Sequence, residues 1–233
     1  MKVKSSLFLL PGLLCDEVVW VEQVKALSPY ADIIIPSFRG KNSLKDMAQE
    51  VIAQAPEKFS VVGHSMGARV ALEIINIAPD RIDKIALMDT GVHPVQPGEK
   101  EKRQTFLDLA NTQGMAAVAR SWALPMVGSS HRQDEELMTE IYAMVERYTL
   151  SEYEGQLQAL LGRSDQAPYL KNITQHVLLV CGDEDNWSPV SQHQEMLQAL
   201  NSAELKIVKD SGHMVTMEQP EAVNKILVDW FCA

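Results

Sequence analysis

The chain has 233 residues, of which 46% are hydrophobic and 22% are charged, the composition of a globular protein and not of a disordered or fibrous one. This length favours one domain with a substantial core. The formal net charge of −10 repels a phosphate backbone and gives no polybasic signal for anionic lipid, so neither nucleic acid nor a membrane is an expected partner.

The three cysteines, at positions 15, 181 and 232, are too few and too scattered for a disulfide framework, and neither CxxC nor HExxH occurs. No apolar run approaches the roughly 18 residues of a membrane span. Near the start, the run Leu7–Leu10 is ended by Pro11-Gly12, so we interpret it as a buried strand and not as part of a signal sequence. These features lead us to expect a cytoplasmic protein.

Short apolar runs that end in turn residues alternate with helical patterns along the first part of the chain. Helical spacing is expected over residues 16–27, over Leu44–Ala55 with Ser43 as N-cap, and from about Met66 to Ala78. Strands are expected at Ser5–Leu10, Asp32–Ile35, Phe59–Val62 and Ile82–Met88.

The alternation resumes near the end, with strands expected at Gln175–Cys181 and Glu204–Val208 and helices near 190–199 and 219–231. Strands that read as continuous apolar runs, separated by helices, predict an α/β fold with a mostly parallel sheet covered by helices on both faces.

Residues 95–168 break this alternation, because they contain helical patterns and no strand-like run. A helical insertion between two parallel strands should lie over the carboxyl edge of the sheet, where open α/β sheets bind ligands. We therefore predict a core formed by residues 1–94 and 169–233, and a helical lid formed by residues 95–168.

A candidate nucleophile lies in Gly63-His64-Ser65-Met66-Gly67, a G-x-S-x-G motif that follows an expected strand and opens an expected helix. In that setting the serine is forced into a sharp turn, and the glycines remove Cβ atoms that would clash across it. Ser65 should then project above the sheet. A serine hydroxyl is a weak nucleophile, so a base must lie within hydrogen-bond reach.

Of the six histidines, His213 follows the last expected strand, which places it at the same sheet edge as Ser65. The acid is expected in Gly182-Asp183-Glu184-Asp185, after the preceding strand. Asp185 lies in the middle of the loop, where it is free to reach the histidine. Asp183 directly follows the glycine, where it is better placed to stabilise the turn, and it remains the alternative acid.

Acyl transfer also needs two backbone N–H groups that face the developing oxyanion. One should come from Met66, the residue after the nucleophile. The other should come from the loop Pro11-Gly12-Leu13-Leu14, and we expect it to be Leu13, with Gly12 permitting a close approach.

Taken together, these segments resemble the α/β-hydrolase superfamily over nearly the whole chain. The resemblance rests on the loop Leu10–Leu14, the turn Gly63–Gly67, Gly182-x-x-Asp185 and Gly212-His213. It implies a serine esterase with no metal and no organic cofactor. The D-x-R-G-x-G-x-S pattern frequent in that family is degraded here to Ser37–Ser43, which makes Arg39 a structural residue in this interpretation.

The function expected from the sequence is hydrolysis of a carboxylic ester with a small or medium hydrophobic acyl group, through an acyl-enzyme on Ser65. Activity should fall at acidic pH as His213 becomes protonated. Residues expected to line the substrate site are Leu14, Trp122, Met126, Met144, Trp187 and Met214. The oligomeric state is left open.

Three alternatives remain. A thioester substrate is suggested by Gly-His-Ser-Met-Gly-Ala, although acidic residues outnumber basic ones in the lid, where a carrier protein would need a basic face. A lyase or C–C bond hydrolase could use the same serine. A member of the fold that binds a ligand without catalysis is the alternative outside enzymes, and the complete set of Ser65, His213 and Asp185 speaks against it.

Overall fold

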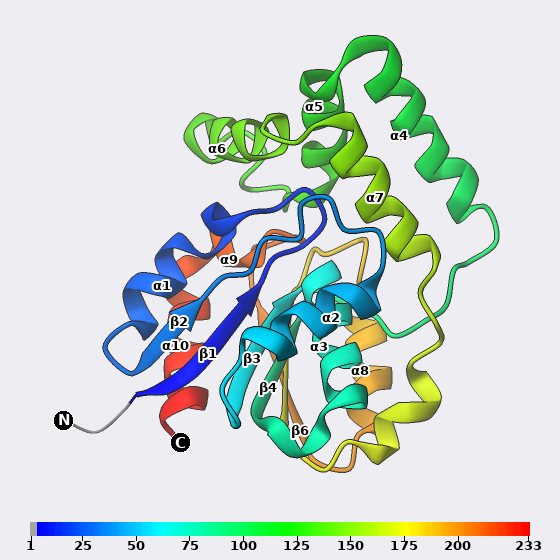
Figure 1. Cartoon of the computed structure of the whole chain (residues 1–233). Coiled ribbons are helices and arrows are strands. Elements are labelled where there is room, and N and C mark those ends of the chain that lie inside the picture. The colour runs from blue at the N-terminus through cyan, green and yellow to red at the C-terminus, as the bar shows by residue number, and fades with distance from the viewer. Residues whose placement is uncertain (1–3) are drawn as a thin grey trace.

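A six-stranded parallel sheet runs through the computed structural model, which describes residues 4–233 (Figure 1). The strand order is β2-β1-β3-β4-β5-β6, and every neighbouring pair is parallel. The strands are β1 (Ser5–Leu10), β2 (Ala31–Ile34), β3 (Phe59–His64), β4 (Ile82–Met88), β5 (Val177–Gly182) and β6 (Ala203–Val208). The expected α/β fold with a parallel sheet is confirmed.

The central strands are buried on both faces, which explains why they read as continuous apolar runs. Every residue of β3 and β5 is buried, although side chains of successive residues point to opposite sides of the sheet. At the edge, β6 is mostly partly buried or exposed, and its Ile207 side chain faces solvent. The sequence pattern therefore distinguishes the central strands, which are continuous apolar runs, from the edge strand β6, which carries polar residues.

Helices cover both faces of the sheet (Figure 1). On one face lie α1 (Val21–Leu27), α9 (Val215–Glu218) and α10 (Pro220–Cys232), and α1 packs against α10. The other face carries α2 (Leu44–Gln54), α3 (Met66–Ile77) and α8 (Val190–Ala199). Helix α2 begins as expected at Ser43, whose side chain accepts a hydrogen bond from the Asp46 N–H.

The helix expected over residues 16–27 is divided in two. Asp16 accepts a hydrogen bond from the Val18 N–H and starts a 3₁₀ turn over Glu17–Trp20, after which α1 begins at Val21. The turn buries Trp20 completely. A capping side chain at Asp16 thus sets a tighter first turn than hydrophobic spacing alone indicates.

Between β4 and β5 the chain forms four α-helices, a 3₁₀ helix at Ala167–Asn172 and no strand, as the sequence predicts for an all-helical insertion. The helices are α4 (Glu99–Gln113), α5 (Met115–Met126), α6 (Glu135–Glu146) and α7 (Leu150–Leu161). They lie together above the end of the sheet, at the top of Figure 1. Gly114, with a φ of 79°, separates α4 from α5. We call α4–α7 the helical insertion.

Charged and polar side chains fasten the helical insertion to the loop after β1. Arg147 donates to Asp16 Oδ1 at 2.9 Å and to Oδ2 at 2.7 Å, and the Tyr148 hydroxyl donates to the Cys15 carbonyl at 2.6 Å. Arg39 donates to the Arg147 carbonyl at 2.9 Å and lies over the Tyr148 ring. Arg39 therefore has the structural role expected of it.

No helix within residues 4–233 is both long enough and apolar enough to cross a membrane.

Candidate active site

Ser65 lies in the sharp turn between β3 and α3. Its backbone has a φ of 54° and a ψ of −113°, a conformation that residues with side chains rarely adopt. A Cβ atom added at Gly63 would lie 2.5 Å from the Ala68 backbone, and one added at Gly67 would overlap the Leu10 carbonyl. Both positions of the motif therefore require glycine, as predicted from the sequence.

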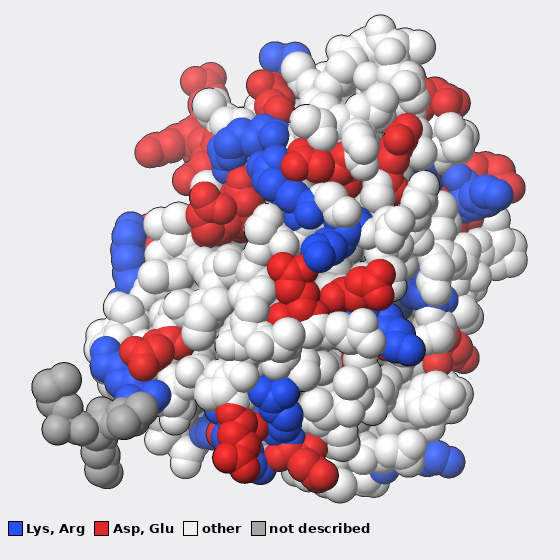
Figure 2. Space-filling view, viewed as in Figure 1, with Lys and Arg blue, Asp and Glu red and all other residues white. Residues whose placement is uncertain are grey.

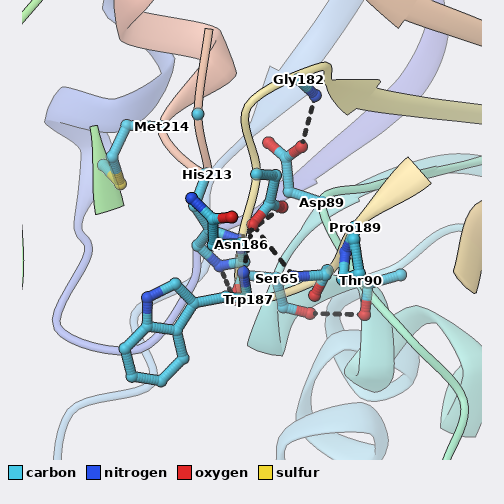
Figure 3. A network of polar contacts seen from close by, with 12 residues as sticks. Ser65, Asp89, Thr90, Gly182, Asn186, Trp187, Pro189, His213 and Met214 are labelled. Atoms are coloured by element: carbon cyan, nitrogen blue, oxygen red, sulfur yellow. Dashed lines mark hydrogen bonds and ion pairs between the residues drawn. The ribbon is translucent and has the colours of Figure 1, made fainter. Parts of the chain in front are cut away.

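Ser65, His213 and Asp185 come from three distant parts of the chain and form one line of hydrogen bonds. Figure 3 shows Ser65 and His213 side by side. Asp185 Oδ2 lies 2.8 Å from His213 Nδ1, and His213 Nε2 lies 2.8 Å from Ser65 Oγ. Because a carboxylate accepts at Nδ1, that nitrogen carries the proton, and Nε2 is free to accept from the serine hydroxyl. This is the arrangement that proton removal from a serine requires.

Asp185 is the acid that contacts the histidine. Its second oxygen accepts N–H bonds from Trp187 and Ser188, at 2.8 and 2.9 Å. Burial acts to raise the pKa of Asp185, but His213 and the two N–H donors outweigh it and hold the pKa below its usual value. The carboxylate is therefore charged at neutral pH, although Asp185 is only 3% exposed.

Asp183, the alternative acid, points elsewhere. Its carboxylate pairs with Lys209 at 3.2 Å and accepts from the Ser211 N–H at 3.5 Å. These contacts join the loop after β5 to the loop after β6, which is the turn-stabilising role considered for Asp183.

A buried carboxylate that sequence reasoning missed holds the His213 loop. Glu218, on α9, accepts hydrogen bonds from the N–H groups of Gly128, Gly212 and Met214, at 2.7, 2.9 and 3.1 Å. The His213 N–H itself donates to the Met126 carbonyl at 2.7 Å. Glu218 thus joins the end of α5 to the loop that carries His213, and no motif spacing marked it.

A second buried histidine and aspartate lie behind this line. His64 Nε2 is 2.7 Å from the His213 carbonyl, and burial followed by the nearby His213 lowers the pKa of His64 to about 4. Neutral His64 therefore donates to that carbonyl. Asp89, whose Oδ1 accepts from the Gly182 N–H, is fully buried, and burial raises its pKa well above the usual value. Both residues support the loops around the site through these hydrogen bonds.

Two backbone N–H groups beside Ser65 have no acceptor among residues 4–233. Within residues 4–233, neither the Leu13 nor the Met66 N–H donates a backbone hydrogen bond, whereas the Leu14 N–H donates to the side chain of Gln156 at 2.9 Å. Leu14 has a φ of 57°, which turns the chain there. Leu13 and Met66 both line the cavity described next, as an oxyanion site would require.

Ser65 and His213 open onto a cavity of about 240 Å³ between the sheet edge and the helical insertion. Three of the residues expected at the substrate site line it, namely Trp122, Met126 and Trp187. The other three, which are Leu14, Met144 and Met214, are fully buried and do not line it. Trp187 is 43% exposed, so it lies at the mouth.

The cavity wall is also charged, which sequence reasoning did not anticipate. Besides apolar side chains, it carries Arg69, Lys102, Arg103 and Arg163, with Glu99 among them. These residues come from α3, α4 and the segment after α7, and only the fold brings them together. An apolar pocket was expected, and the wall instead combines apolar side chains with these four cationic ones and with polar residues.

Within the described part of the chain, no three histidine, cysteine, aspartate or glutamate side chains gather in a way that could hold a metal ion. Cys15 and Cys181 are both buried and unpaired.

This chain is similar to known proteins in both sequence and structure. A family model described as "Alpha/beta hydrolase family" matches residues 7–226. A Bacillus subtilis protein with the inferred assignment of 2-succinyl-6-hydroxy-2,4-cyclohexadiene-1-carboxylate synthase is 25% identical over 194 residues, which cover 80% of this chain and 70% of that protein. A Caulobacter segnis protein with the inferred assignment of carbamate hydrolase RutD is 26% identical over 235 residues, covering 93% and 87%.

A solved structure of a thermophilic esterase from Thermogutta terrifontis superposes with a TM-score of 0.89. The match covers 98% of this chain and 89% of the esterase, at 22% sequence identity. At that identity the likeness demonstrates a shared fold.

Proposed function

This chain belongs to the alpha/beta hydrolase family, and from that premise we propose that it cleaves carboxylic esters of small or medium acyl groups through an acyl-enzyme on Ser65. The observation that carries the proposal is the continuous line of hydrogen bonds from Ser65 Oγ through His213 to Asp185. The unused N–H groups of Leu13 and Met66 beside it support the same chemistry.

In the first half of the reaction, Ser65 Oγ attacks the ester carbonyl carbon while its proton passes to His213 Nε2. Asp185 stabilises the imidazolium that forms. The carbonyl oxygen becomes an oxyanion and accepts from the Leu13 and Met66 N–H groups, each of which is worth roughly 3–4 kcal/mol of barrier. The tetrahedral intermediate then collapses, and the alcohol leaves with the proton from His213.

In the second half, water attacks the acyl-enzyme and gives its proton to His213. The intermediate collapses, Ser65 Oγ recovers the proton, and the carboxylic acid leaves. The balance is one ester and one water converted to one acid and one alcohol.

The cavity supports a substrate of limited size. A volume of about 240 Å³ lies just below the usual range of small-molecule sites, roughly 300–1,000 Å³. Phe106, Trp122 and Met126 from the helical insertion supply apolar surface next to Ser65. In this proposal the helical insertion acts as a lid that shapes the acyl site.

A fluorophosphonate probe tests the nucleophile. Wild-type protein is expected to be labelled at one site, and Ser65→Ala is expected to lose the label, because only a serine activated by a neighbouring base reacts readily. Ser151→Ala, on an exposed position of α7, is the matched control and should label like wild type. Absence of label on the wild type would favour a ligand-binding protein without catalysis.

A substrate panel then separates the enzyme alternatives. Oxygen esters and thioesters of the same acyl groups share the carbonyl and differ only in the leaving group, so their kcat/KM values can be compared directly. We expect the oxygen esters to be hydrolysed at least as efficiently as the thioesters. A strong preference for thioesters, or cleavage of a C–C bond with no ester hydrolysis, would contradict it.

A further inference from the structure

The cavity wall beyond Ser65 is electrically unlike the rest of the molecule. The chain carries a net charge of −10, and acidic and basic side chains are interspersed on the face shown in Figure 2. The cavity, by contrast, is lined by the four cationic side chains Arg69, Lys102, Arg103 and Arg163, against the two acidic residues Glu99 and Asp89. A concentration of positive charge beside a reactive serine points to a negatively charged substrate.

Glu99 is fully occupied by two of these arginines. Arg103 donates to Glu99 Oε1 at 2.9 and 2.8 Å, and Arg163 donates to the same oxygen at 2.7 Å and to Oε2. Burial acts to raise the pKa of Glu99, but the Arg163 and Arg103 hydrogen bonds and the Gln96 N–H outweigh it and lower the pKa to about 2. Both oxygens of this one carboxylate are therefore hydrogen-bonded to Arg103 and Arg163, and its single negative charge leaves these groups with a net positive charge.

Arg69 is the guanidinium of this group that has no carboxylate in direct contact, although the charge of Glu99 acts on it from further away. Its Nη1 donates to the His93 carbonyl at 3.2 Å, and within residues 4–233 it has no carboxylate oxygen within 4.0 Å. Burial, and then the charge of Arg163, lower the pKa of Arg69 to about 9, which leaves it protonated at neutral pH. A partly buried cation with free donors is unfavourable unless an anion binds there.

The position of Arg69 relates it directly to the nucleophile. It lies in the first turn of α3, four residues after Ser65, which is the N-cap of that helix, and both residues line the cavity. The planar fork of a guanidinium matches the two oxygens of a carboxylate.

We propose that Arg69 binds a carboxylate of the substrate, so that the natural substrate is an ester that carries a second, ionised carboxyl group a few bonds from the scissile carbonyl. This inference rests on the proposed ester hydrolysis for its chemistry, but the anion site can be tested without catalysis. Arg103 and Arg163 reinforce the positive potential, and Glu99 fixes their positions.

The first experiment measures binding in the absence of turnover. Ser65→Ala protein is titrated with monobenzyl adipate by isothermal calorimetry, and the same titration is made with Ser65→Ala/Arg69→Gln. Loss of a charged hydrogen-bonded pair should weaken binding roughly 10- to 100-fold. Ser65→Ala/Arg120→Gln is the matched control, because Arg120 is exposed on α5 and does not line the cavity, so its affinity should equal that of Ser65→Ala.

The second experiment measures selectivity among three matched esters. These are benzyl hexanoate, which is neutral; monobenzyl adipate, with the carboxylate on the acyl side; and 4-carboxybenzyl hexanoate, with the carboxylate on the alcohol side. The wild type is expected to prefer one of the charged esters over the neutral one, and the better charged ester identifies the side that faces Arg69. The measured quantity is kcat/KM for the preferred charged ester divided by kcat/KM for the neutral ester. In Arg69→Gln this ratio should fall roughly 10- to 100-fold, and in Arg120→Gln it should not change.

Two readouts keep this inference separate from the proposed function. If no ester is hydrolysed but the calorimetric affinity depends on Arg69, the ester hydrolysis is wrong and the anion site stands. If the neutral ester is preferred and Arg69→Gln alters neither ratio nor affinity, the anion site is wrong and the hydrolysis stands. Arg69→Lys, which keeps the charge and loses the fork, should give intermediate values, and circular dichroism of each variant verifies its fold.

Discussion

The backbone at Ser65 is strained, and hydrogen bonds from neighbouring residues maintain its conformation. A non-glycine residue at positive φ costs about 1–3 kcal/mol, and the surrounding contacts must supply that energy. The Ser65 N–H donates to the Met88 carbonyl at 2.9 Å, and the Thr90 hydroxyl donates to the Ser65 carbonyl at 3.2 Å. The His193 imidazole in turn accepts from the Thr90 N–H. These contacts explain how the serine stays directed at His213 before any substrate binds.

Replacing Asp185 with asparagine tests the acid at the scale of one residue. The amide removes the charge that stabilises the imidazolium and can present an N–H to Nδ1, which favours the wrong tautomer. We expect kcat to fall by about 10⁴-fold, with little change in KM. Steady-state kinetics with one ester substrate measures both constants.

Asp183→Asn is the matched control, because it removes the same charge from the same loop. Asp183 pairs with exposed Lys209 and does not contact His213, so kcat should stay within about threefold of wild type. Equal losses in the two variants would contradict the assignment of Asp185 as the acid.

At the scale of the elements, the helical insertion depends on a few polar connections to the rest of the molecule. Glu99, at the start of α4, joins Arg163 just after α7, so the first and last helices of the insertion are held together at the cavity. The Gln156 side chain on α7 accepts from the Leu14 N–H in the loop after β1. Through these contacts the insertion fixes both the cavity wall and the loop that carries the Leu13 N–H.

Replacing Glu99 with glutamine should destabilise the protein at neutral pH by about 1–3 kcal/mol, because two guanidinium groups lose their carboxylate. The pKa of Glu99 is lowered to about 2, against about 4.3 in an unfolded chain, so its stabilisation is complete above the unfolded value and is lost as the pH falls toward 2. The difference in unfolding free energy between wild type and Glu99→Gln should therefore shrink from pH 7 to pH 3, as urea denaturation can measure.

Glu101→Gln is the matched control for that series. Glu101 is exposed on the same helix, and within the described residues its side chain forms no ion pair, so the variant should unfold like wild type at every pH. A difference for Glu99→Gln that stays constant, or grows, as the pH falls would show that its ion pairs do not stabilise the insertion.

At the scale of the whole molecule, the sheet and its helical insertion could be predicted from the sequence because burial leaves a direct pattern. Strands β1 and β4 have the predicted bounds, since each is a continuous apolar run closed by turn residues. The segment 95–168 was distinguished by the absence of such runs. The fold prediction is confirmed, whereas the catalytic roles of Ser65, His213 and Asp185 stay predictions that the variants above test.

The cavity wall could not be predicted, because it depends on contacts between residues far apart in the chain. Met144 and Met214 have the apolar character of acyl-site residues, but both are fully buried away from the cavity. Apolar spacing in the sequence indicates that a residue is buried, and does not indicate which residues pack against it. Arg69, Glu99 and Arg163 read as ordinary solvated charges in the sequence, and only the folded chain brings them to one cavity. Glu218 likewise gives no signal before α9 is seen beside Gly128 and Gly212.

The proposed ester hydrolysis depends on a covalent intermediate at one residue, Ser65. Rapid quenching of the reaction with a 4-nitrophenyl ester, followed by peptide mass mapping, measures that intermediate directly. We expect a burst of nitrophenol together with a single acyl group on the peptide containing Ser65, and neither in Ser65→Ala. An acyl group on another residue, or steady hydrolysis that persists in Ser65→Ala, would contradict it.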